Sequence, residues 1–94
     1  MDIKKYKLET VDYQTINVPK IDDIINFKDQ FLNLEIQNNE PCIWCLVDDG
    51  EPTQEIGIVI FGTGMEIPIL SKNEYLGTYM LRGGDFVYHV FLEL

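Results

Sequence analysis

The sequence predicts an all-β fold, a compact sandwich or barrel of about seven mostly antiparallel strands with at most one short helix. Short segments that alternate apolar and polar residues recur along the chain, and turn residues separate them at regular spacing. Only the segment between Ile21 and Gln30 carries apolar residues near helical spacing. The chain has 94 residues, 46% of them apolar, which suffices for one folded domain, 1–94, and no more.

In the first half of the chain, three segments are typical of strands with one face in water. They are residues 3–10, 13–19 and 31–38, in which apolar side chains alternate with charged, hydroxyl or amide side chains. Between the second and the third segment, Asp22 is a candidate N-cap for a short helix that ends near Gln30.

Four further segments, residues 42–47, 56–61, 75–81 and 86–92, complete the strands. All but 75–81 are apolar on both faces, which is typical of strands in the middle of a sheet or under another subunit. Because not every strand of a small domain can be central, we expect a closed, symmetric homo-oligomer. Turn residues separate the strands at 38–41, 48–52, 62–64, 68 and 83–84.

The charge excludes several classes of partner. Seven Lys and Arg residues stand against sixteen Asp and Glu, which gives a net charge of −9. Binding to DNA or RNA depends on a basic patch that neutralises phosphates, and docking on an anionic membrane needs the same, so we expect neither. No apolar run approaches 18 residues and no signal peptide is visible, so we expect a soluble protein that stays in the cytoplasm.

Cys42 and Cys45 form a CxxC spacing, which is found in redox pairs and zinc sites. The surrounding residues predict a strand, however, on which positions i and i+3 lie about 10 Å apart on opposite faces. A disulfide needs Cα atoms within about 7 Å, and zinc would need two more ligands, for which His89 is one candidate. We therefore interpret the pair as buried structural thiols in a reducing compartment.

Residues that could perform chemistry are scarce. His89 lies in the apolar segment FVYHVF, which favours a core or interface histidine hydrogen-bonded to backbone over a general base. Asp48, Asp49 and Glu51 lie in a turn, where solvated surface charge is favoured over a metal cage. We expect no catalytic residue, no metal and no cofactor, and hence no enzyme.

A glycine segment follows the predicted strand at residues 56–61. Gly62, Thr63 and Gly64 begin like a dinucleotide-binding fingerprint, but Ile67 replaces its third glycine and Pro68 follows where a helix should run. The segment is either a plain hairpin turn or a turn whose backbone N–H groups converge on an anionic oxygen.

Arg82 is the only arginine, and it lies just before Gly83 and Gly84. It either joins a surface ion pair or offers its planar fork to a phosphate. Three aromatic residues, which either stack on bases or fill a core or interface, are Trp44, Tyr75 and Tyr79.

Five motifs, in this order, resemble a large family of small phage proteins. They are residues 37–44 (QNNEPCIW), 46–48 (LVD), 61–64 (FGTG) followed by IP at 67–68, 75–79 (YLGTY), and the pair GG at 83–84 with VYHVF at 87–91. The resemblance covers nearly the whole chain and is strongest to the branch of anti-CBASS sponge proteins. It implies a homotetramer that sequesters cyclic dinucleotides such as cyclic GMP-AMP. Residues 20–30 are longer and more charged than the short turn typical of the family, so no ligand contact is carried over there.

The resulting hypothesis is a phage immune-evasion protein that binds a cyclic dinucleotide in the host cell cytoplasm without cleaving it. On chemical grounds, Gly62, Thr63, Gly64 and Arg82 are assigned to phosphate or ribose oxygens. Trp44, Tyr75 and Tyr79 are assigned to the bases. Two alternatives stay open: a structural or assembly protein of the virion, and an inhibitor that binds a host protein through its acidic surface.

Overall fold

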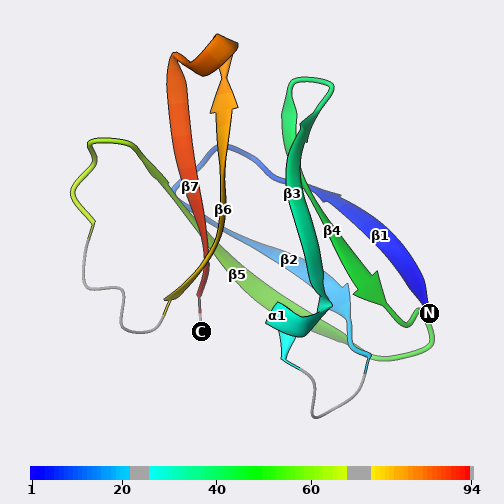
Figure 1. Ribbon diagram of the computed structural model, residues 1–94. Helices are drawn as coiled ribbons and strands as arrows, with labels where there is room; N and C mark the ends of the chain where they lie inside the picture. Colours follow the sequence, from blue (N-terminus) through cyan, green and yellow to red (C-terminus); the bar gives the residue numbers. More distant parts are fainter. Residues whose placement is uncertain (22–25, 68–72, 94) are drawn as a thin grey trace.

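The computed structural model describes residues 1–21, 26–67 and 73–93, and it confirms the all-β prediction. Seven strands form two sheets in which all pairings are antiparallel (Figure 1). The three-stranded sheet has the order β1 (Asp2–Lys7), β4 (Glu40–Val47), β3 (Phe31–Gln37). The four-stranded sheet has the order β2 (Tyr13–Pro19), β5 (Thr53–Gly62), β7 (Phe86–Glu93), β6 (Asn73–Leu81).

The strands that are apolar on both faces occupy the centres of the sheets. β4 lies between the other two strands of its sheet, and β5 and β7 are the two inner strands of the other. This is the position that their composition predicts, because a central strand has no edge in water and packs on both sides.

The helical prediction is correct in kind and wrong in extent. The helix α1 spans only Phe27–Gln30, and Asn26 occupies its N-cap position without a side-chain hydrogen bond. The predicted cap, Asp22, lies outside the described residues. A short 3₁₀ turn, η1 (Arg82–Gly84), joins β6 to β7.

Every strand except β2 differs from its predicted bounds by one to three residues, and two of these differences concern the connections between strands. β1 stops at Lys7, because the chain then crosses from one sheet to the other. The turn between β3 and β4 uses only Asn38 and Asn39, both with positive φ (53° and 64°), so Glu40 and Pro41 already belong to β4. Asparagine tolerates this left-handed conformation better than most residues, which explains the tight hairpin.

The core lies between the inner faces of the two sheets. Its most buried members include Ile43 of β4, Ile58 of β5 and Val90 of β7, none of which has any exposed surface. The sheets come closest where β3 meets β6. At that point a Cβ atom on Gly77 would lie 3.0 Å from Cδ2 of Leu34, so glycine permits the close approach.

A buried amide joins the two sheets. Gln30, at the end of α1, has no exposed surface. Its Nε2 donates to the carbonyl oxygens of Pro19 in β2 (2.9 Å) and Leu46 in β4 (3.0 Å). Its Oε1 accepts from Gln54 Nε2 in β5 (2.8 Å). Both hydrogens and the oxygen of this amide are therefore used across the two sheets.

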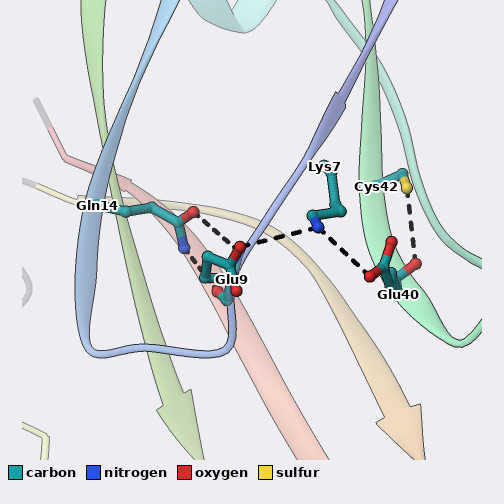
Figure 2. Close-up of polar contacts among 5 residues, drawn as sticks. All are labelled: Lys7, Glu9, Gln14, Glu40 and Cys42. Atoms are coloured by element: carbon teal, nitrogen blue, oxygen red, sulfur yellow. Dashed lines mark hydrogen bonds and ion pairs between the residues drawn. The ribbon is translucent and has the colours of Figure 1, made fainter.

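The segment that crosses from β1 to β2 is held by polar contacts at its start (Figure 2). Lys7 Nζ lies between the carboxylates of Glu9 (3.9 Å) and Glu40 (3.4 Å). Glu9 and Gln14 exchange two hydrogen bonds between backbone and side chain (3.0 and 2.7 Å). The ion pairs are exposed and contribute little, so the backbone-directed amide of Gln14 is the stronger constraint.

We expect Gln30→Leu to lower the free energy of unfolding by about 2–4 kcal/mol, because it leaves one buried carbonyl, one partly buried carbonyl and the Gln54 amide without their partner. Chemical denaturation followed by tryptophan fluorescence measures this loss. Gln37→Leu is the matched control, since Gln37 is exposed and its side chain accepts a hydrogen bond from the exposed Lys5. Equal losses in the two variants would show that the Gln30 amide has no special role.

Candidate functional site

The outer face of the four-stranded sheet, the side away from the core, brings candidate residues together. Core residues such as Ile58, Val90 and Tyr79 point inward, so the alternate residues of each strand point outward. The strand register aligns these outward residues in rows across the sheet. One row is Tyr13, Val59, Phe91 and Tyr75, and the next is Phe61, His89 and Thr78.

Four polar side chains on this face form one continuous set of hydrogen bonds, which we call the hydroxyl–imidazole chain (Thr63, His89, Thr78 and Tyr75). His89 Nε2 lies 2.7 Å from Thr63 Oγ1, and His89 Nδ1 lies 3.0 Å from Thr78 Oγ1. The Tyr75 hydroxyl is hydrogen-bonded to the same Thr78 oxygen. Both threonines and Tyr75 are exposed, so their remaining hydrogen-bonding capacity faces outward.

Aromatic rings border the hydroxyl–imidazole chain. Phe91 packs edge-on against Phe61 (5.8 Å between ring centroids) and against Tyr75 (5.5 Å). The two phenylalanines are buried, whereas the Tyr75 residue is 54% exposed. The buried rings thus hold Tyr75 in place while part of its surface stays available to a planar ligand.

The glycine turn positions Thr63 at one end of the hydroxyl–imidazole chain. Thr63 N–H donates to the carbonyl of Val87 (3.0 Å), and Met65 N–H donates to the carbonyl of Gly62 (3.1 Å). Gly64 has a φ of 90°, a conformation that side chains rarely adopt. A hollow of about 480 Å³ opens beside Thr63, and Asp85 contributes a carboxylate to its lining. The segment is therefore a structured turn, with a threonine hydroxyl presented beside a hollow.

Of the seven residues assigned to a ligand from the sequence, the structure brings together four. Gly62, Thr63 and Gly64 form the turn, and Tyr75 joins it through His89 and Thr78. Thr78 and His89 were missed as site residues. The interpretation of His89 as bonded to backbone was wrong, because both of its ring nitrogens meet threonine hydroxyls and the residue is partly exposed.

The other three predicted residues lie elsewhere. Tyr79 is only 3% exposed, its hydroxyl is 2.8 Å from Thr10 Oγ1, and burial raises the pKa of that hydroxyl. Its ring belongs to the core and offers no face to a base, so we remove it from the site. Trp44 pairs with Lys5 and Asn33 on the outer face of the other sheet. Arg82 lines a separate hollow at the end of the sandwich.

The cysteines are buried thiols, as predicted, and the strand explains why. Cys45 faces the core from β4, whereas Cys42 faces the other side and donates to the carbonyl of Glu40 (3.6 Å; Figure 2). Burial raises the pKa of the Cys45 thiol from 9.0 to about 12. Within residues 1–21, 26–67 and 73–93, no group of three metal-ligating side chains is close enough to hold an ion.

One protein-family model, described as "Domain of unknown function (DUF7352)", matches residues 1–94. No curated protein and no solved structure matches the chain significantly. Among the described residues, no helix is long and apolar enough to cross a membrane.

We expect both thiols to resist alkylation by iodoacetamide at pH 8 in the native protein, because they are buried and the raised pKa of Cys45 leaves about one thiol in ten thousand ionised. Mass spectrometry after a timed reaction measures this. In guanidinium chloride both thiols should react fully, which serves as the control. Rapid native labelling at either position would contradict the buried arrangement.

Proposed function

The chain belongs to the DUF7352 family, and we propose that it binds a cyclic dinucleotide such as cyclic GMP-AMP and sequesters it without cleaving it. In this proposal the protein serves a phage by blocking CBASS signalling in the cytoplasm of the infected cell. The observation that carries the proposal is the exposed hydroxyl–imidazole chain beside the Tyr75 ring. The five motifs that resemble the sponge proteins support it independently.

The chemistry of the outer face suits a nucleotide. The Tyr75 ring offers a stacking surface for a base, which is worth about 1–3 kcal/mol per base. Thr63 and Thr78 supply donors and acceptors for base edges or ribose hydroxyls, because each hydroxyl already bonded to the His89 imidazole retains further capacity. Once copies of the chain enclose this face, a missed partner would leave a polar group unpaired, which is how the site would discriminate between bases.

The same geometry favours binding over cleavage. A general base needs a ring nitrogen that faces the reacting proton, but both nitrogens of His89 are engaged by threonine hydroxyls. Asp85 at the hollow beside Thr63 would also repel a phosphate placed against it. The phosphates of a bound cyclic dinucleotide are therefore expected on the side of His89 and Thr78, away from Asp85.

We propose that copies of the chain together enclose the ligand, as a homotetramer. The outer face is open in a single chain, with Tyr13 and Tyr75 each about half exposed. A cyclic dinucleotide has two nucleotide halves, so a two-fold axis between copies would repeat each contact. Sedimentation velocity should then show an oligomer; a monomer at micromolar concentration would contradict this part of the proposal.

The main test measures binding of a panel of cyclic dinucleotides by isothermal titration calorimetry. We expect Thr63→Val and Thr78→Val each to weaken binding at least tenfold, since each removes a hydroxyl of the hydroxyl–imidazole chain without changing side-chain size. Thr15→Val is the matched control, because Thr15 is an exposed threonine of β2 that does not belong to the hydroxyl–imidazole chain.

Ligand recovered after heat denaturation should be chemically unaltered, as shown by mass spectrometry. If all three variants bind a cyclic dinucleotide as tightly as the parent protein does, the outer face is not the binding site. If no cyclic dinucleotide binds, the proposal fails, and a role in virion assembly or in binding a host protein takes its place.

A further inference from the structure

We propose that the open end of the sandwich holds a second ligand site, separate from the outer face, that takes a nucleoside monophosphate. The turn between β3 and β4 and the turn between β6 and β7 lie at the same end of the molecule (Figure 1). Between them is a hollow of about 630 Å³, within the usual range for small-molecule sites. We call it the end pocket; its lining includes Asn39, Met80, Arg82, Phe86 and Tyr88.

Arg82 is the feature that points to an anion. It is the only arginine of a chain with net charge −9, yet it forms no ion pair with any carboxylate in the described part of the chain. Its guanidinium carbon lies 5.6 Å from the centroid of the Phe86 ring. Stacking on a ring orients a guanidinium while leaving its N–H edge free, and that edge matches two oxygens of a phosphate.

The backbone holds Arg82 in this place at a cost. Its φ is 51°, a left-handed conformation that is unfavourable for residues with a side chain. Glycine would adopt the same conformation without that cost, and Gly83 and Gly84 follow directly with φ of 65° and 102°. A turn that keeps arginine at a position suited to glycine is explained if the guanidinium has a role in the end pocket.

The remaining lining indicates a planar group beside the anion. Phe86 is 45% exposed, and Met80 is 59% exposed, so apolar surface is available for a flat ring. On the opposite rim, Asn39 carries an amide at the tip of the β3–β4 hairpin, and an amide can pair with the edge of a base. A phosphate at Arg82, a ring against Phe86 and a base edge at Asn39 together describe a nucleoside monophosphate.

This site does not depend on the proposed function. The end pocket and the hollow beside Thr63 share only Phe86 and Tyr88 in their linings, and none of the four residues of the hydroxyl–imidazole chain lines the end pocket. Binding of a monophosphate at Arg82 can therefore succeed or fail whatever happens with cyclic dinucleotides at Thr63 and Thr78.

The test is calorimetric titration of the full chain with AMP and GMP, with adenosine and inorganic phosphate as partial ligands. We expect at least one monophosphate to bind with a Kd below 1 mM, and each partial ligand to bind at least tenfold more weakly. Arg82→Gln and Phe86→Leu should each weaken binding at least tenfold. Arg82→Gly should also abolish binding while melting at no lower temperature than the parent, because it relieves the left-handed backbone.

Two control variants test whether the loss of monophosphate binding is specific to the end pocket. Lys28→Gln removes one positive charge from α1, at the opposite end of β3 from the β3–β4 turn (Figure 1), so it changes net charge as much as Arg82→Gln does and should leave binding unchanged. Thr63→Val should also leave monophosphate binding unchanged. Failure of both monophosphates to bind at millimolar concentration overturns the proposal, as does an equal loss in Lys28→Gln or in Thr63→Val. Equal binding of adenosine would overturn the role assigned to Arg82.

Discussion

The amide of Gln30 is the constraint on which the arrangement of the two sheets depends. A buried polar group is tolerated only when its hydrogen bonds are made, and this one makes them to β2, β4 and β5 at once. The apolar core alone would allow the sheets to slide, because hydrophobic contacts are not directional. The amide fixes one relative position, since its planar geometry fits only when all three partners are in place. α1 has only four residues, and it delivers Gln30 to this position.

With the sheets fixed, the register of the inner strands determines what the outer face presents. β5, β7 and β6 place Phe61, His89 and Thr78 in one row. An irregularity in β6 between Tyr75 and Gly77 then changes the usual alternation. Tyr75 and Thr78 are three residues apart, a spacing that puts side chains on opposite faces of a regular strand, yet here both face outward. The hydroxyl–imidazole chain exists because of this local irregularity.

These two constraints explain which features could be predicted from the sequence and which could not. The fold class, the number of strands and the central position of β4, β5 and β7 follow from alternation and from apolar residues on both faces, which are local properties. The extent of α1 did not follow, because apolar residues at helical spacing over so short a segment also fit a loop that packs on a core. The site was only partly predictable. Thr63 and Tyr75 were found by residue type, whereas Thr78 is visible only once the strand irregularity is known. His89 was set aside because apolar neighbours suggested burial, although the same alternation already placed it with Phe91 on one face.

Net charge constrains both proposed sites, because an acidic protein can bind a nucleotide only through groups placed where its own field is weakest. In the proposed dinucleotide site, the hydroxyls of Thr63, Thr78 and Tyr75 would meet this constraint, because uncharged donors and acceptors neither attract nor repel a phosphate at long range. The proposed site in the end pocket would meet it differently, with one arginine that no described carboxylate pairs with and that an aromatic ring orients. Charge-assisted hydrogen bonds are roughly twice as strong as neutral ones, so a single guanidinium can offset an unfavourable field over a short distance. The strength of both sites should therefore depend on hydrogen-bond geometry more than on ionic strength, in contrast to proteins that hold nucleic acids through many phosphate contacts.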